Sequence, residues 1–481
     1  MSGRTTTDIG TTGARPRGRD EGAPGHLGLS IVWSREEPGR VGQVALFPVA
    51  SGPRVLGRGG PSEGEREGRA RFVEQRPGEN HLTPFLSGSK LSRRQVLIAP
   101  SKAGLRVTRI GRSPMSVAGR EVDACDLAPG DVLSFHRELL LLCVRRPDVL
   151  PRLATFRDDG FPFGEADGAG IAGESPAAWE LRDRLAFAAA RPLHVLILGE
   201  SGTGKELAAQ SIHALSPRRA RPLVARNAAT LPAGILDAEL FGNVRDYPNP
   251  GMRERKGLLG EADGSTLFLD EIGELPEDLQ AHLLRALDAG GQYHRLGEAQ
   301  ARSSDLRFVG ATNRSPERLK HDFLARLTLR ITLPGLHDRP EDIPLLVRHL
   351  LRTDARKDPD LEARFFAAGE PRVASDLVES LVTHRFTHHV RELKVLLWQA
   401  ISGSRTDTIE RTAEVEQALS RGTAPPPVPA ADLTREVIVA CIDRHHGVLE
   451  RVWRELGLAN RFALGRLLKK HGIRPRAGEE A

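Results

Sequence analysis

The stretch Gly199-Glu200-Ser201-Gly202-Thr203-Gly204-Lys205-Glu206 decides the fold of the central part of this chain. It follows an apolar run at residues 195–198, typical of a buried strand, and precedes residues 207–215, which have a helical pattern. Glycines at such a junction let backbone N–H groups face phosphate oxygens, and Lys205 reaches the outer phosphates. The stretch therefore predicts a phosphate-binding loop, although Glu206 stands where Ser or Thr usually holds magnesium.

A second stretch supports this interpretation. Residues 266–269 read as an apolar strand that ends in two carboxylates, Asp270 and Glu271. Asp270 is suited to hold Mg²⁺ through water, and Glu271 to polarise the water that attacks the terminal phosphate. The alternative is a glycine turn plus an ordinary acidic strand end. Both halves occur in the expected order within one plausible domain, so we expect ATP and Mg²⁺ as cofactors.

Composition sets wider limits. The chain has 481 residues, enough for about three domains of ordinary size. A formal net charge of +6 and a pI near 9.5 permit binding to nucleic acid. The three cysteines have no metal-binding spacing and suit a reducing cytoplasm. No apolar run is long enough for a membrane span, and residues 1–27 read as a disordered tail without a secretory signal.

Residues 28–146 contain many short apolar runs separated by Gly, Pro and Ser, a pattern that predicts a β-sandwich. The runs lie at residues 29–33, 44–47, 54–58, 95–98, 105–107, 131–135 and 139–144. Residues 147–169 are rich in Pro, Gly and Asp and read as a linker.

The predicted sandwich resembles a forkhead-associated domain, a reader of phosphothreonine peptides, through Gly57-Arg58, Leu91-Ser92-Arg93-Arg94 and Gly130-Asp131. The resemblance implies that Arg58, Ser92 and Arg93 bind a phosphopeptide, a role that guanidinium and hydroxyl groups suit. Gln95 stands where the family usually has His, and residues 112–115 replace its Asn-Gly loop. A sandwich kept only for protein contacts is the alternative.

Residues 170–334 alternate strands with helices, which predicts a parallel α/β sheet that binds its ligand at one edge. Residues 222–227 and 305–313 supply further strands, and residues 335–403 are mostly helical and read as a lid. Six motifs occur in order: GESGTGKE at 199–206, ELFG at 239–242, GSTLFLDEIGELP at 264–276, DLRFVGATN at 305–313, LPGLHDRPEDIP at 333–344 and VREL at 390–393. Together they resemble the AAA+ ATPase domain of bacterial enhancer-binding proteins, the activators of sigma-54 RNA polymerase, in which the phosphate loop ends in Glu.

This resemblance implies roles for single residues. Asn313 positions the hydrolytic water, Asn227 restrains Glu271, and Arg391 is the lid residue that contacts nucleotide. Arg326 is the finger that reaches a neighbour's γ-phosphate, which implies a ring, most simply a hexamer.

Two departures concern the ring's activity. Lys320 stands where relatives carry a second arginine, and lysine keeps the charge but loses the fork. Relatives also place a GAFTGA loop, which contacts the sigma factor, between Gly242 and Gly257. This chain has Asp246-Tyr247-Pro248-Asn249-Pro250-Gly251 there, which predicts a stiffer turn and leaves the sigma-54 contact open.

The C-terminal part begins with a Pro-rich stretch, so residues 404–430 read as a linker. Residues 431–476 are basic and predict three helices with a Gly turn, a helix-turn-helix that resembles the Fis-type DNA-binding domain of these activators. The third helix would bring its N-terminal residues to the major groove and its lysines to phosphates. The candidate DNA-binding residues are Asn460, Arg461, Arg466, Lys469 and Lys470.

The sequence thus predicts a multidomain chain: a β-sandwich, an α/β ATPase core with a helical lid, and an all-α helix-turn-helix. We expect a cytoplasmic transcription regulator whose partners are DNA, sigma-54 RNA polymerase, a phosphothreonine protein or Ser/Thr kinase, and further copies of itself, with no membrane partner. Two alternatives stay open: a DNA-binding ATPase that no longer contacts sigma-54, and a phosphopeptide-responsive scaffold with an idle ring.

Overall fold

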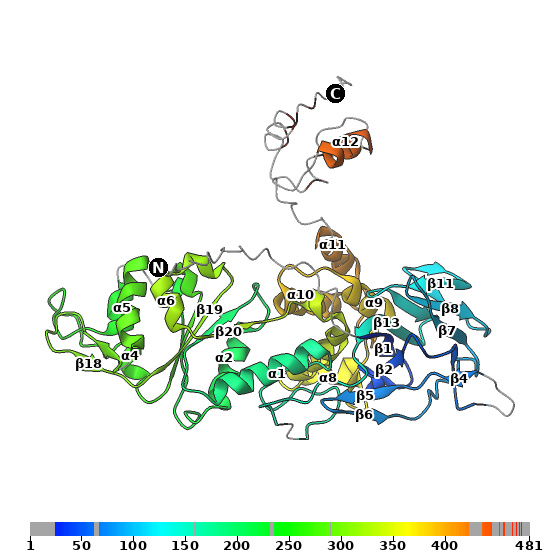
Figure 1. The fold of residues 1–481 in the computed structure, drawn as a ribbon, viewed down its shortest axis with the longest axis horizontal. Helices are drawn as coiled ribbons and strands as arrows, with labels where there is room; N and C mark the ends of the chain where they lie inside the picture. Colours follow the sequence, from blue (N-terminus) through cyan, green and yellow to red (C-terminus); the bar gives the residue numbers. More distant parts are fainter. Residues whose placement is uncertain are drawn as a thin grey trace, which may run out of the picture.

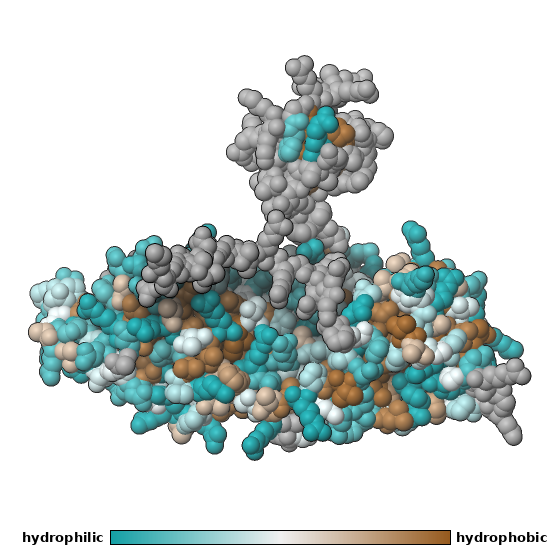
Figure 2. Space-filling model, viewed as in Figure 1, coloured by the Kyte–Doolittle hydropathy of each residue, from teal (hydrophilic) through white to brown (hydrophobic). Residues whose placement is uncertain are grey.

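The computed structural model describes residues 25–61, 67–157, 160–230, 235–288, 290–422 and 435–444, and the single residues 452, 456, 464, 468, 471 and 473. In Figure 1 the N-terminal strands lie at one end of the main body and the α/β core at the other, with the lid helices between them. Hydrophilic residues cover most of the visible face, with apolar patches among them (Figure 2). Among the described residues, no helix has the length and apolar character needed to cross a bilayer.

The N-terminal part is a sandwich of two sheets. The larger sheet has the order β10-β9-β12-β13-β1-β2-β5-β6 and the smaller the order β11-β8-β7-β3-β4. Its strands are β1 (His26–Ser34), β2 (Val44–Phe47), β3 (Arg54–Leu56), β4 (Gly68–Arg69), β5 (Val73–Arg76), β6 (Glu79–Leu82), β7 (Val96–Pro100), β8 (Leu105–Arg109), β9 (Ser116–Val117), β10 (Arg120–Glu121), β11 (Ala124–Leu127), β12 (Val132–Phe135) and β13 (Leu139–Arg146). Each of the seven predicted apolar runs contains or overlaps an observed strand.

The α/β core contains a five-stranded sheet with the order β15-β16-β19-β14-β20 and parallel pairing throughout. Its strands are β14 (Val195–Leu198), β15 (Val224–Asn227), β16 (Thr266–Asp270), β19 (Arg307–Thr312) and β20 (Leu329–Thr332). Alternate side chains of β14 enter two different apolar clusters, so both sheet faces are covered. One face carries α1 (Pro176–Ala189) and α2 (Lys205–Ala214), and the other carries α3 (Leu236–Phe241), α4 (Leu258–Glu261), α5 (Glu277–Leu287) and α6 (His321–Arg326).

The lid comprises α7 (Ile343–Ala355), α8 (Pro359–Phe365), the short hairpin β21 (Phe366–Ala367) and β22 (Glu370–Pro371), α9 (Ser375–Thr383), α10 (His389–Gly403) and α11 (Ala413–Gly422). The last helix corrects the predicted linker at residues 404–430. Ile409 and Val415 are fully buried in the lid cluster, so the lid continues to residue 422 rather than ending at 403.

The sandwich docks directly on the lid. Side chains of β13 alternate between two clusters: Leu139, Leu141 and Cys143 face the sandwich core, while Leu140, Leu142 and Val144 face the lid helices. The indole N–H of Trp33 donates to the carbonyl of Val373 in the lid at 2.8 Å. The two parts therefore share one continuous apolar interface.

The predicted linker at residues 147–169 is also packed rather than a free spacer. Phe161 stacks on Trp179 of α1 with ring centroids 5.7 Å apart. Asp167 is buried and accepts from the Arg182 guanidinium at 2.9 Å. Because this segment makes buried contacts with the core, it fixes the sandwich relative to α1.

In the C-terminal part the structure describes α12 (Arg435–Arg444) and a small apolar cluster. The cluster contains Ile438, Cys441, Ile442, Val452, Leu456, Leu464 and Leu468. The candidate DNA-binding residues Asn460, Arg461, Arg466, Lys469 and Lys470 lie outside the described residues.

Candidate functional site

The predicted phosphate-binding loop, residues 199–206, follows β14 and runs into the first turn of α2. Gly202 and Gly204 have φ angles of +85° and +99°, a region that favours glycine. Lys205 begins α2, and its ammonium donates to the carbonyls of Gly199 at 3.1 Å and Glu200 at 3.3 Å. The lysine is 7% exposed, so its charge is held close to the loop by backbone oxygens alone.

Parallel register brings the polar strand ends together. Asn227 lies beside Asp270 in the β15–β16 pair, and Leu198 lies beside Thr312 in the β14–β19 pair. The ends of β15, β16, β19 and β14 therefore meet at one edge, where open α/β sheets bind ligands. Asp270 and Asn313 are both placed there, next to the loop that carries Lys205.

Glu271 follows Asp270 in a left-handed conformation with φ of +53°, and its N–H donates to Asp270 Oδ1 at 2.9 Å. The implied contact between Asn227 and Glu271 is not made in this structure. The Asn227 carboxamide oxygen accepts the N–H of Ala229 at 2.9 Å instead.

These residues fit a magnesium nucleotide. The buried Lys205 ammonium has no carboxylate partner among the described residues, so an anionic phosphate suits it. Asp270 uses one oxygen for a backbone N–H and keeps the other for a cation shell. Glu206 is exposed on the first turn of α2, where a carboxylate suits the helix dipole.

The lid touches the phosphate loop. The N–H of Val390 donates to the carbonyl of Gly202 at 3.0 Å, and Arg391 donates to the hydroxyl of Ser201 at 3.0 Å. A side chain at position 202 would bring its Cβ within 2.0 Å of the His388 carbonyl oxygen. Gly202 is therefore needed for the lid contact, while Thr203 is buried and bonds back to Glu200.

Arg326 lies apart from this edge. It ends α6, its side chain is 53% exposed, and its Nε is 2.6 Å from Asp288 Oδ1 of the same chain. Lys320 is 3.9 Å from Glu277 on the neighbouring α5. The structure thus separates Arg326 from the nucleotide edge of its own chain, in contrast to Arg391.

A buried ionic junction joins sandwich, core and lid. Arg146 of β13 lies 3.5 Å from Glu341 and donates to the carbonyl of Glu174 at 2.9 Å. Asp342 is fully buried and accepts the N–H groups of Glu174 and Ser175 at 2.8 and 2.9 Å. Burial raises the pKa of Glu341, against the pull of Arg146. Burial likewise raises the pKa of Glu174 to about 7.

Three loops of the sandwich meet around Ser92. Arg58 N–H donates to the Ser92 carbonyl at 3.0 Å, and Arg112 N–H donates to the Ser92 hydroxyl at 3.1 Å. Gln95 joins two of these loops. Its carboxamide oxygen accepts from the N–H of Ser92 at 3.2 Å, and its NH2 group donates to the carbonyl of Ser113 at 2.7 Å.

The cationic side chains around Ser92 are available for a ligand. In the described part of the chain, the guanidinium groups of Arg58, Arg93 and Arg112 make no ion pair or hydrogen bond. Arg93 and Arg112 are exposed, and Arg58 is half-buried. The loops therefore present a cluster of unpaired positive charge.

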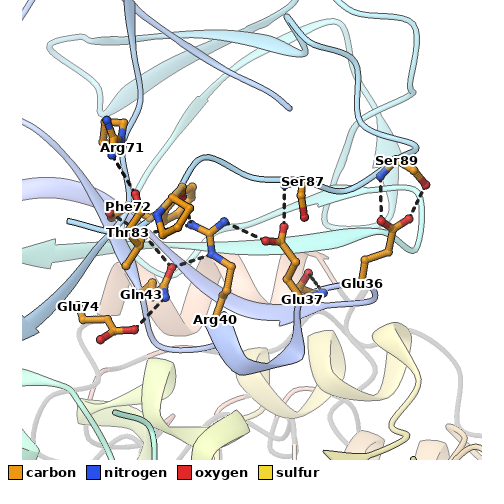
Figure 3. Close-up of polar contacts among 12 residues, drawn as sticks. Glu36, Glu37, Arg40, Gln43, Arg71, Phe72, Glu74, Thr83, Ser87 and Ser89 are labelled. Carbon is orange, nitrogen blue, oxygen red and sulfur yellow. Dashed lines mark hydrogen bonds and ion pairs between the residues drawn. The ribbon is translucent and has the colours of Figure 1, made fainter. Parts of the chain in front are cut away.

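A polar network ties one of these loops to the lid-facing side of the sandwich (Figure 3). Glu36 accepts from the N–H and hydroxyl of Ser89 at 2.9 and 2.5 Å, and Glu37 accepts from the N–H of Ser87 at 3.0 Å. Across the same turn, Arg348 of α7 donates to the carbonyl of Pro38 at 2.6 Å. The segment that precedes Ser92 is thus linked through residues 36–38 to the lid.

The loop at residues 243–256 forms a hydrogen-bonded turn. Asp246 N–H donates to the Met252 carbonyl at 2.9 Å, and Asp246 Oδ1 accepts from Gly251 N–H at 2.8 Å. Tyr247 is 44% exposed and lies against Gly297, where a Cβ would be 2.6 Å from the tyrosine ring. The aromatic ring therefore lies against a neighbouring loop.

Comparison with known proteins identifies the central segment. A family model described as the sigma-54 interaction domain matches residues 171–336. The transcriptional regulatory protein ZraR of Salmonella typhimurium is 35% identical over 331 residues, covering 66% of this chain and 72% of the relative. The DNA-binding transcriptional regulator NtrC of Klebsiella pneumoniae is 41% identical over 196 residues, covering 39% and 42%. The crystal structure of NtrX from Brucella abortus in complex with ATP is 29% identical, with a TM-score of 0.44, and the match covers 63% of this chain and 69% of that one.

The matched segment contains the phosphate loop, the acidic end of β16 and Asn313. The central domain binds and hydrolyses ATP. The chain therefore belongs to the family of sigma-54-dependent activators, which regulate transcription in an ATP-dependent manner.

Proposed function

We propose that this chain is a DNA-binding regulator that assembles into a ring, most simply a hexamer, and uses ATP hydrolysis to remodel a promoter complex. The observation that supports this best is the gathering of Lys205, Asp270 and Asn313 at one sheet edge, with Arg391 of the lid against the same loop. Hydrolysis at that edge can move the lid and the surface loop at 243–256 together. The descriptions of ZraR and NtrC as transcriptional regulators support the same role here.

In this proposal each residue at the edge has one task. Residues 199–206 bind the phosphates, with Lys205 neutralising the outer ones and Asp270 holding Mg²⁺ through water. Magnesium supplies charge neutralisation on the phosphate oxygens. Glu271 takes the proton of the attacking water, and Asn313 orients that water. Asn227 restrains Glu271 in a conformation other than the one observed, because its amide now caps Ala229.

The ring requires that Arg326 act on a neighbour. Its half-exposed guanidinium is held by Asp288 and can exchange that carboxylate for a neighbour's γ-phosphate. A mixing experiment tests this: Arg326→Ala subunits lack the finger, and Lys205→Ala subunits lack nucleotide binding. Each alone is inactive, and the mixture recovers ATP turnover because one partner supplies the nucleotide and the other the arginine. A mixture as inactive as its components would refute a finger that acts between subunits.

We also propose that the sandwich is a forkhead-associated domain that binds phosphothreonine through Arg58, Ser92 and Arg93 and thereby gates the ring. The unpaired guanidinium groups and the path from Ser89 through residues 36–38 to Arg348 support this. Isothermal titration with a phosphothreonine peptide library tests it. Arg58→Ala is expected to abolish binding and phosphopeptide-dependent changes in ATPase rate, and the proposal fails if neither changes.

DNA binding is assigned to residues 431–476, with Asn460 and Arg461 at base edges and Arg466, Lys469 and Lys470 at phosphates. The apolar cluster that joins α12 to Leu464 and Leu468 fits a small helical domain. Arg461→Ala should weaken binding to a preferred site more than to random duplex, whereas Lys469→Ala should weaken both equally.

Whether the target is sigma-54 depends on the altered loop. Its ordered turn, in which Tyr247 lies against Gly297, is the observation behind the second candidate, a DNA-binding ATPase that no longer contacts sigma-54. The scaffold alternative predicts nucleotide binding without turnover, so ATP hydrolysis that is lost in Glu271→Gln excludes it.

A further inference from the structure

His389 is the most unusual residue at the junction of lid and phosphate loop. It is the first residue of α10, its side chain is fully buried, and its φ of +44° lies in the left-handed region. A residue with a Cβ adopts that backbone at a cost in free energy, so surrounding contacts must offset it. Those contacts connect the lid to the phosphate loop.

The hydrogen bonds of His389 fix its tautomer. Nδ1 lies 3.1 Å from the backbone nitrogen of Leu336, and because an N–H can only donate, Nδ1 is the acceptor. The proton of the neutral ring is therefore on Nε2, which donates to Glu200 Oε2 at 3.0 Å. One imidazole thus bonds the first turn of the lid, Leu336, to a side chain of the phosphate loop.

The contact belongs to a short series. His389 bonds the side chain of Glu200, Val390 N–H bonds the carbonyl of Gly202, and Arg391 bonds the hydroxyl of Ser201. Three consecutive lid residues therefore hold three consecutive residues of the loop. The carbonyl of Glu200 also accepts from the ammonium of Lys205 at 3.3 Å. Glu200, whose side chain bonds His389, therefore also helps to position the lysine.

We propose that His389 is a positioning residue for ATP hydrolysis, which clasps Glu200 and so holds Arg391 and the lid in register with the phosphate loop. His389 itself need not touch the nucleotide. Because His389 and Glu200 bond to each other rather than to a reacting group, we expect this contact to contribute to nucleotide binding more than to the chemical step. Its loss should raise KM for ATP and leave kcat nearly unchanged.

The test is a double-mutant cycle on the full chain, with steady-state ATPase kinetics and equilibrium binding of a fluorescent ATP analogue. His389→Ala and Glu200→Ala should each raise KM about three- to tenfold, the range for a charge-assisted hydrogen bond with a partly exposed partner. The double variant should show no more than the larger single effect, because both changes break the same bond. Glu200→Gln keeps an acceptor for Nε2–H and should recover more than half of the loss.

Controls separate positioning from folding. Glu180→Ala removes an exposed carboxylate on α1 that pairs with Arg184, and it should leave KM within error of the wild type. Glu200 is itself largely exposed, so its variants remain informative if His389→Ala fails to fold. Additive effects in the cycle, or a wild-type KM for Glu200→Ala, would overturn the proposal. A fall in kcat without a change in KM would also overturn it.

Discussion

Replacing Arg146 by alanine tests how firmly the sandwich is held on the lid. The guanidinium is 1% exposed, and its nearest carboxylate, Glu341, has a side chain that is 10% exposed. Removing one partner of a buried pair leaves an uncompensated charge, which typically costs about 3–5 kcal/mol. Among the described residues, Nε and Nη2 of Arg146 have no hydrogen-bond partner, so we expect the lower figure, about 3 kcal/mol.

The loss should depend on pH. Burial already raises the pKa of Glu341, and removal of Arg146, which lowers it, should raise that pKa further. The free-energy loss in Arg146→Ala should therefore be largest near pH 8 and shrink as the pH falls, because a neutral carboxyl needs no counter-charge.

Native-state hydrogen exchange is the suitable assay, because a chain of several domains does not unfold in one step. At pH 8, amides of β13 and of the first turn of α7 should exchange about 100-fold faster in Arg146→Ala, as a factor of ten corresponds to about 1.4 kcal/mol. Arg145→Ala is the matched control, because Arg145 is the exposed neighbour on the same strand.

The double variant Arg146→Met with Glu341→Met separates charge from packing. It should exchange more slowly than Arg146→Ala, since apolar side chains of similar volume replace a buried pair with little loss. Exchange in Arg146→Ala at the rate of Arg145→Ala would refute a stabilising role for the buried ion pair. So would a double variant that is the least protected of the three.

Two further predictions follow from the same structure. Gly202→Ala should reduce ATP affinity at least tenfold, because the new Cβ would lie 2.0 Å from the His388 carbonyl oxygen and push the lid off the phosphate loop. Nucleotide titration measures the affinity, and circular dichroism should show that the core sheet stays folded. The pKa of Glu174 is raised from 4.5 to about 7, so the protonated carboxyl stabilises the fold at low pH. That contribution, at most about 3 kcal/mol, is lost as the pH rises through this range. The melting temperature of Glu174→Gln should therefore fall less between pH 5 and 8 than that of the wild type, even if the variant is more or less stable at every pH.

The sequence was most informative where the chemistry is local. Residues 199–206 and the Asp270-Glu271 end of β16 could be placed on one edge because each follows a buried strand and parallel strands end together. In the structure the ammonium of Lys205 contacts the carbonyl of Gly199, and Arg391 contacts the hydroxyl of Ser201 in the same loop.

Contacts between distant segments were beyond the sequence patterns. The run at residues 139–144 predicted a strand, but the lid helices that cover its second face come from a distant segment of the chain. Helix α11 was missed because the nearby prolines suggested a linker, whereas Ile409 and Val415 bury themselves in the lid. The clasp of His389 on Glu200 spans 189 positions, so no local pattern could indicate it.

Promoter opening by the purified chain tests the central proposal most directly. Open-complex formation on a sigma-54 promoter should be followed by permanganate footprinting, with protein in excess so that upstream DNA is not limiting, and with ATP or a non-hydrolysable analogue. We expect opening that needs hydrolysable ATP and is lost in Lys205→Ala. ATP turnover without opening would contradict remodelling of this promoter complex and would favour a different target for the loop at residues 243–256.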